Sequence, residues 1–62
     1  MKSSDIIRRL EKAGWSCVRQ KGSHMQFRHP EVAGTVTVPH PKSEMGIGTI
    51  KSIERQSGIK LR

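Results

Sequence analysis

The sequence predicts an α+β fold in the order α-β-β-β-α, with two helices on one face of a three-stranded antiparallel sheet. Apolar residues recur at helical spacing near both ends of the chain, and two short segments between them alternate apolar with polar residues. Glycine and proline residues separate these segments. With 62 residues, of which 32% are hydrophobic, the chain can build one small core, so residues 1–62 are expected to form a single domain.

The first helix is expected to begin near Ser3 or Ser4 and to end at Gly14. Either serine can cap the helix, Asp5 complements the positive end of its dipole, and Gly14 is a natural C-terminal stop. Four apolar residues follow helical spacing and would face the core: Ile6, Ile7, Leu10 and Ala13. The charged residues between them would face solvent.

Three strands are expected in the middle of the chain. Residues 15–20 form the first strand, and residues 21–23 form a turn that leads into the second strand at residues 24–29. Residues 35–38 alternate threonine with valine and form the third strand, which the prolines in residues 39–41 should end. If both helices cover one face of this sheet, the other face is open to solvent or to a ligand.

The second helix is expected to begin at Gly46, Gly48 or Thr49 and to end at Gly58. Its apolar residues Ile50 and Ile53 would complete the core. In the C-terminal tail, Ile59 and Leu61 are expected to pack back onto the core, and the basic residues Lys60 and Arg62 are expected to fray.

The charge of the chain favours a polyanionic partner. Twelve Lys and Arg residues against five Asp and Glu give a formal net charge of +7, which in so small a domain points to nucleic acid first. Membrane binding is less favoured, because neither expected helix pairs a basic face with a bulky aromatic apolar face. Cys17 is the only cysteine and excludes an intramolecular disulfide, and the N-terminus has no signal-peptide pattern, so we expect a cytoplasmic location.

The segment from Lys21 to His29 concentrates the residues that could carry chemistry. In an extended strand, His24, Gln26 and Arg28 fall on one face, and the apolar pair between them falls on the other. An imidazole beside cationic groups suits the binding or cutting of a phosphodiester. The plainer alternative is that His24 is only a polar strand residue after a glycine turn.

Several motifs along the chain together match one known family. They are Ala13-Gly14-Trp15, Gly22-Ser23-His24, Phe27 with His29-Pro30, Val38-Pro39-His40-Pro41, and Gly46-Ile47-Gly48-Thr49-Ile50 with Ile53 and Gly58. In this order, from about Ser4 to Ile59, the chain resembles the HicA family. HicA proteins are ribosome-independent mRNA interferases, the toxins of HicAB toxin–antitoxin systems.

The resemblance implies a double-stranded-RNA-binding-domain-like fold, which agrees with the element order expected from the residues. It also implies an endoribonuclease that acts on mRNA, and a HicB-type antitoxin that neutralises it in a hetero-oligomer. His24 occupies the position of the family's catalytic histidine. Many members have a second histidine directly after it, where this chain has Met25, and we expect this difference to affect packing or a substrate contact.

Metal-independent RNA cleavage is consistent with these residues. It needs a base to take the 2′-hydroxyl proton and an acid to protonate the leaving 5′-oxygen, and a histidine titrates near neutral pH and can do either. Lys21, Arg19 and Arg28 are the candidates for stabilising charge on the phosphate. No cofactor or metal is expected, because the spacings of the histidines and Cys17 match no zinc pattern. The alternative is a non-catalytic basic RNA-binding module of the double-stranded-RNA-binding-domain type.

Other candidate residues have two interpretations each. Ser23 could shape the turn or bind a phosphate oxygen, and no Ser-His-acid arrangement supports it as a nucleophile. His40, between two prolines, could contact substrate or merely end a strand, whereas His29 before Pro30 favours a structural role. Trp15 is expected in the core rather than as a base-stacking platform.

Overall fold

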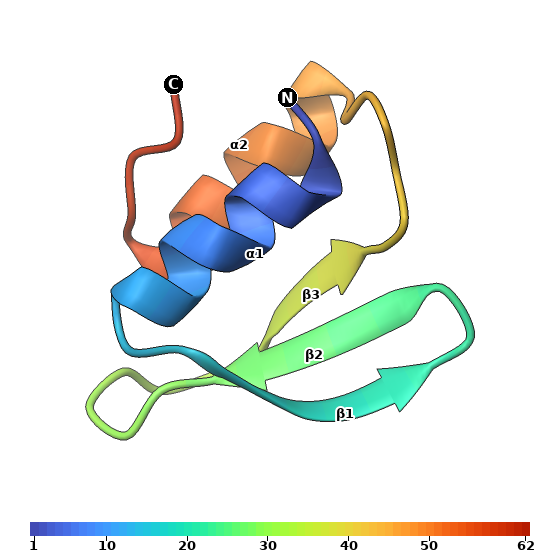
Figure 1. Ribbon diagram of the computed structural model, residues 1–62. Coiled ribbons are helices and arrows are strands. Elements are labelled where there is room, and N and C mark those ends of the chain that lie inside the picture. The colour runs from blue at the N-terminus through green and yellow to red at the C-terminus, as the bar shows by residue number, and fades with distance from the viewer.

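The computed structural model describes residues 1–62 and confirms the predicted order of elements (Figure 1). Helix α1 spans Ser3–Lys12 and helix α2 spans Ile47–Ser57. Between them, β1 spans Ser16–Lys21, β2 spans His24–Arg28 and β3 spans Val36–Pro39. Neither helix has the length and apolar character needed to cross a membrane.

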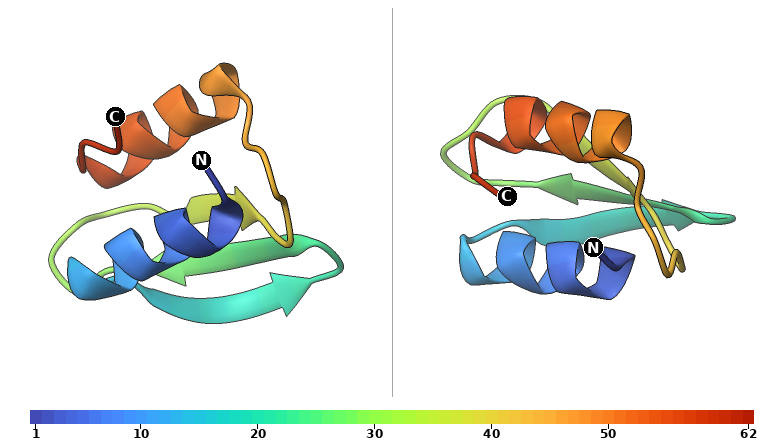
Figure 2. Two further views of the ribbon diagram at one scale, coloured as in Figure 1. Left: turned by 45° about the horizontal axis from the view of Figure 1, so that its top comes forward. Right: turned by 90° about the horizontal axis from the view of Figure 1, so that it is seen from above.

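The three strands form one antiparallel sheet in the order β1-β2-β3. Both helices lie over the same face of this sheet and run in the same direction (Figures 1 and 2). The opposite face carries no helix, as the sequence predicts. We call the helix-covered side the inner face and the open side the outer face.

The core lies between the inner face and the two helices. The sheet contributes Phe27, Val36 and Val38, all with no exposed surface. Burial of apolar side chains of this size contributes about 1.5–3 kcal/mol each. The helices contribute Ile6, Leu10, Ile50 and Ile53, and the connecting segments contribute Trp15, Met45 and Leu61. Met25, predicted to face this core, is partly buried and packs against it.

The start of α1 differs from the prediction. Ser3 does not cap the helix; it is the first helical residue, the N-cap is Lys2, and no side chain makes a capping hydrogen bond. Ser3 is 1% exposed, and its hydroxyl is turned to the segment after β3, where it contacts the backbone of Lys42 and the ring of His40. Because the Ser3 hydroxyl contacts residues after β3, it does not cap α1.

The C-terminal tail packs Leu61 onto the core, as predicted, but the expected fraying of Lys60 and Arg62 is wrong, because both residues are held. Leu61 is buried, and the carboxylate of Glu54 accepts hydrogen bonds from the backbone N–H of Leu61 at 2.7 Å and of Arg62 at 3.2 Å. Arg9 donates to the carbonyl oxygen of Lys60 at 2.7 Å. The hydrogen bond from Leu61, followed by that from Arg62 and the Arg62 charge, lowers the pKa of Glu54.

The ends of the strands differ from their expected places by at most one residue. Pro39 lies inside β3 rather than after it, because it is the last residue of the ladder and stands opposite His24. Trp15 precedes β1 and is buried, as predicted, with its ring 5.3 Å from that of His29. The backbone N–H of His40 donates to the carbonyl oxygen of Ser23 at 2.6 Å, which joins the residue after β3 to the turn between β1 and β2.

Candidate functional site

The β1–β2 hairpin places His24 at the start of a strand. Only Gly22 and Ser23 separate the two strands, and Gly22 has a φ of 58°. Two-residue turns that suit the twist of a hairpin need a positive φ at their first position, which glycine adopts without steric cost. This turn fixes the register of the hairpin, so that Lys21 stands opposite His24.

A row of three residues crosses the sheet at His24. Lys21 of β1 pairs with His24, which in turn pairs with Pro39 of β3. Side chains of directly paired residues lie on the same face, with Cβ atoms about 4.5–5.5 Å apart. The side chains of Lys21 and His24 are therefore neighbours on the outer face, and both residues are exposed.

A second row lies two residues along β2 on the same face. Arg19 pairs with Gln26, which pairs with Thr37. A diagonal neighbour across an antiparallel pair lies about 7–8 Å away, within reach of a long side chain. Arg19 can therefore approach a group bound at His24, although a β-bulge at residues 17–19 interrupts the ladder just beyond it.

The charged residues on the outer face are all basic. Its paired positions hold the cations Arg19, Lys21 and Arg28 and no carboxylate; the others are Ser16, His24, Gln26, Thr37 and Pro39. None of these cations takes part in an ion pair within the chain, since the salt bridges involve other residues. Their charge is therefore available to a polyanion.

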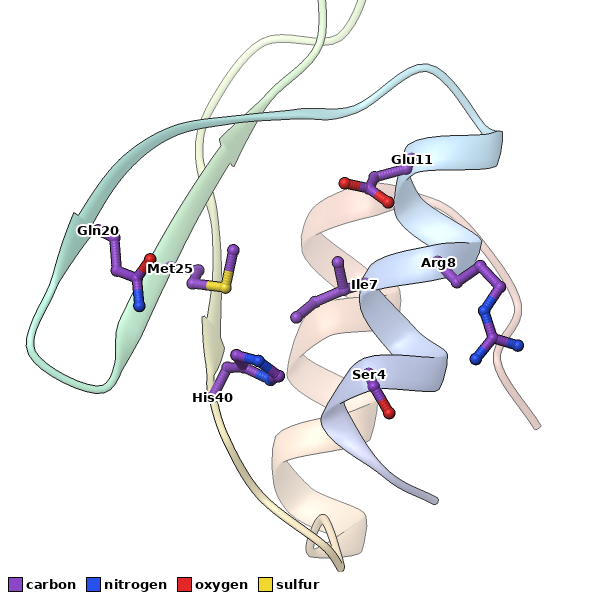
Figure 3. A pocket seen from close by; sticks show the side chains of 7 residues that line it. All are labelled: Ser4, Ile7, Arg8, Glu11, Gln20, Met25 and His40. Carbon is purple, nitrogen blue, oxygen red and sulfur yellow. The ribbon is translucent and has the colours of Figure 1, made fainter.

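The remaining predicted candidates lie elsewhere. Arg28 is on the outer face but four residues along β2 from His24, opposite Ser16. Ser23 is exposed in the turn beside His24. His40 lies on the helix-covered side of the sheet, so the structure does not bring it together with His24 on one face (Figure 3).

His29 has the structural surroundings that the sequence favours. Its Nε2 lies 3.1 Å from the carbonyl oxygen of Ala13, and its Nδ1 accepts the backbone N–H of Glu31 at 3.0 Å. The ring packs so close to the chain that a Cβ at Gly14 would lie 2.7 Å from Nε2, which only glycine avoids. His29 therefore joins the end of α1 to the β2–β3 connection.

No group of three or more His, Cys, Asp or Glu side chains gathers in the structure in a way that could hold a metal ion. Cys17 is a free, exposed thiol. The outer face offers an imidazole, an ammonium group and a guanidinium group at neighbouring positions. This set of groups can move protons and neutralise a phosphate.

Two residues of the site were not singled out as candidates from the sequence. The alternation within β2 puts Gln26 on the same face as His24, but nothing in the sequence indicates a role for it. Thr37 lies beside Gln26 because of the register between β2 and β3. The alternation within residues 35–38 marks Thr37 as facing away from the core, but nothing local indicates which β2 residue it meets. The register of two strands that are joined by a seven-residue connection depends on the packing of the whole core.

Comparison with known proteins gives a consistent result. Residues 3–59 match the family model described as the HicA toxin of bacterial toxin–antitoxin systems. Among solved structures, a chain of the HicA3 and HicB3 toxin–antitoxin complex is 33% identical, covers 100% of both chains and superposes with a TM-score of 0.86. A search of proteins with curated functions found no match.

Proposed function

Because this chain belongs to the HicA family of toxins of bacterial toxin–antitoxin systems, we propose that it is an endoribonuclease that cuts mRNA with His24 as its catalytic residue. The observation that carries the proposal is the pair formed by His24 and Lys21. It is an exposed imidazole beside an unpaired ammonium group, on a sheet face without a carboxylate. We place its action in the cytoplasm, where its substrate is found.

The reaction that fits these groups is transesterification of the RNA backbone. The 2′-hydroxyl attacks the adjacent phosphorus, the P–O5′ bond breaks, and the products are a 2′,3′-cyclic phosphate and a free 5′-hydroxyl. His24 takes the 2′-hydroxyl proton or delivers a proton to the leaving 5′-oxygen, and either role contributes about 10²–10⁴-fold. Water can serve at the other position.

Lys21 and Arg19 have a different task in this mechanism. Negative charge grows on the phosphate oxygens as the 2′-oxygen attacks, and fixed cations stabilise it most where it develops. Lys21 is the direct neighbour of His24, and Arg19 is the diagonal one. Ser23, in the turn directly before His24, can donate a hydrogen bond from its hydroxyl to a phosphate oxygen.

The substrate is expected to lie along the outer face. Arg28 continues the positive charge to the far end of β2, with Gln26 and Thr37 between it and His24. Such a strip suits single-stranded RNA, whose backbone can follow a line of cations while its bases remain accessible. This surface is the mRNA-binding site in our proposal.

The partner follows from the same face. The structural relative belongs to a complex of HicA3 with HicB3. We propose that a HicB-type antitoxin binds this chain in a hetero-oligomer and covers His24 with complementary acidic surface. Comparing solvent protection of His24 in free and bound protein tests this, and an inhibited complex in which His24 stays fully accessible would exclude direct occlusion.

The test of the activity is cleavage of RNA by the purified protein in excess EDTA. We expect the wild-type chain to cut RNA and the His24→Ala chain to bind RNA and antitoxin without cutting. Equal cutting by both chains would remove His24 from the mechanism. Cutting that EDTA abolishes and a divalent ion restores would indicate a metal-dependent nuclease, and RNA binding without any cutting would indicate a non-catalytic RNA-binding module.

A further inference from the structure

A groove lies on the helix-covered side of the sheet, between α1 and the β1–β2 hairpin. Its volume is about 490 Å³, within the range of small-molecule sites in proteins. Ile7 of α1 and Met25 of β2 point toward one another across it, and Glu11, Gln20 and His40 project into it around them (Figure 3). The guanidinium of Arg8 turns away from the groove and pairs with Asp5 at 3.2 Å.

One arrangement of protons satisfies all the contacts of the Ser3 hydroxyl at once. The Ser3 hydroxyl accepts the backbone N–H of Lys42 at 2.8 Å, lies 3.2 Å from the Lys42 carbonyl oxygen, and lies 2.8 Å from His40 Nδ1. The hydroxyl has one proton to donate. All three contacts are hydrogen bonds only if it donates to the carbonyl oxygen and accepts from Nδ1–H. In the neutral ring with this arrangement, His40 Nε2 has a lone pair that can accept a hydrogen bond.

The groove therefore offers hydrogen-bond acceptors on two sides. The ring of His40 lies toward one end and the carboxylate of Glu11 toward the other (Figure 3). The carboxylate only accepts hydrogen bonds, and a neutral imidazole with its proton on Nδ1 accepts at Nε2. The amide of Gln20 can do either. Between them, the Ile7 side chain and the Met25 thioether form an apolar slot, and a thioether packs well against a flat ring.

The groove lies on the opposite side of the sheet from the proposed cleavage site, but three of its residues are chain neighbours of residues in that site. Met25 follows His24, Gln20 precedes its cross-strand partner Lys21, and His40 follows Pro39, its other partner. Because β1 is at one edge of the sheet, an RNA strand on the outer face can pass over Lys21 and round this edge. The nucleotide next to the cut bond then meets the groove.

We propose that this groove is a base-recognition subsite that holds one unstacked base of the RNA, preferring bases with an exocyclic amino group. The inference rests on the proposed endoribonuclease function and gives it a sequence preference. Extruded bases are read by hydrogen bonds to their edges and by packing between apolar side chains, which is what this groove offers. Adenine, cytosine and guanine present amino donors to Glu11 and His40. Uracil has a carbonyl oxygen in place of the amino group and only its N3–H as a donor on that edge, so it can satisfy fewer of these acceptors.

The first arm of the test needs no cleavage. Isotope-labelled wild-type protein is titrated with AMP, CMP, GMP and UMP, which contain no phosphodiester bond to cut, and followed by NMR. We expect the Ile7 and Met25 methyl signals and the His40 ring signals to shift, with UMP binding about 5-fold or more weakly. Shifts confined to the outer face, or equal affinity for all four nucleotides, would overturn the proposal.

Glu11→Gln is the variant that tests the acceptor. The residue is exposed, so the fold should survive, while the change removes the negative charge and leaves one neutral acceptor oxygen in place of the two of the carboxylate. Loss of a good base contact should weaken binding of the amino-bearing nucleotides by about 5–150-fold. Glu31→Gln makes the same charge change in the β2–β3 connection, away from the groove, and should bind like wild type. Equal binding by both variants would overturn the proposal.

The second arm maps the ends of the fragments that these three proteins make from an RNA of mixed sequence. Wild type and Glu31→Gln should cut with a preference against uracil at one position beside the cut, and Glu11→Gln should lose that preference while still cutting. An unchanged preference in Glu11→Gln would overturn the subsite but leave the nuclease. A wild-type protein that cuts nothing would overturn the nuclease, and the titration would still decide whether the groove binds bases. If Glu11→Gln weakens only antitoxin binding, the groove is a protein contact and not a base site.

Discussion

The two faces of the sheet are built from the same three strands, but they have opposite properties. On the inner face, Phe27, Val36 and Val38 are completely buried against the helices. On the outer face, His24 and Lys21 are exposed and have no partner in any salt bridge. Because successive strand residues point to opposite sides, the positions that determine folding alternate with those that we assign to chemistry. Each set can be altered separately.

The three histidines show the same contrast within one residue type. His29 has both ring nitrogens near backbone partners, and His40 has one nitrogen held by Ser3. His24 makes no hydrogen bond within the chain through its ring, and it is the one histidine on the outer face. A ring without internal partners is free to exchange protons with a substrate, which is why the proposal assigns catalysis to His24.

The largest effect on stability is expected from Phe27→Ala. Phe27 is the largest fully buried side chain, and its truncation should cost about 3–5 kcal/mol, much of the stability of a small domain. Gln26→Ala, one residue away on the outer face, should change the free energy of unfolding by less than about 0.5 kcal/mol. Urea unfolding of both variants measures the difference. Similar losses in the two would contradict the division between the faces.

A smaller effect is expected from Ser3→Ala. The change removes the hydroxyl that the Lys42 N–H and His40 Nδ1 contact, and unpaired polar groups in such a setting cost about 1–3 kcal/mol. Ser4→Ala is the matched control, because Ser4 is exposed and its hydroxyl makes no hydrogen bond within the chain. Thermal unfolding of the pair should show a lower melting temperature for Ser3→Ala alone. Equal melting temperatures would show that the tie between α1 and the segment after β3 adds no stability.

A weaker and pH-dependent effect is expected at Glu54. The backbone N–H groups of the C-terminal tail lower its pKa in the folded chain below the ordinary value of 4.5. A lowered folded pKa means that the stabilisation is present at neutral pH and is lost as the pH falls below 4.5 through the folded value. Glu54→Gln should therefore unfold more easily than wild type at pH 7, and the difference should shrink in acid. A difference that is constant with pH would contradict a role for the carboxylate charge.

The smallest effect concerns the salt dependence of RNA binding. If Lys21 contacts a phosphate, Lys21→Ala should reduce the slope of log affinity against log salt by about 0.7, the value for one contact with a single strand. Lys60→Ala removes the same charge from the C-terminal tail, away from the outer face, and should leave the slope unchanged. Filter binding over a salt series measures both. Equal slopes for Lys21→Ala and wild type would mean that RNA binds elsewhere.

Much of the fold could be predicted because it depends on local patterns. Helical spacing gave α1 and α2, and Gly22 gave the hairpin turn. The placement of His24 opposite Met25 and Phe27 followed from alternation alone. The boundary errors were small and arose where a side chain has a distant partner, as Ser3 does, or where Pro39 could still occupy the last place of a ladder.

The rest depended on contacts between segments far apart in the chain. Nothing local indicates that Ser3 meets His40, 37 residues away, or that Glu54 holds the tail. The groove between α1 and the hairpin is formed by three separate segments, so its existence follows only from the packed core. The sequence leaves His40 as either a substrate contact or the end of a strand. Because Pro39 belongs to β3 and faces outward opposite His24, the next residue, His40, lies on the other side of the sheet.

The most direct test of the division between the faces measures the cleavage rate and the free energy of unfolding on the same preparations of two variants. His24→Ala should lower the single-turnover rate by about 10²–10⁴-fold and leave stability within about 0.5 kcal/mol. Val36→Ala, on the inner face, should lose about 1.5–3 kcal/mol of stability and keep the wild-type rate per folded molecule. Contradiction would come from a His24→Ala protein that cuts RNA at the wild-type rate, or from one whose loss of activity is matched by a loss of folded protein.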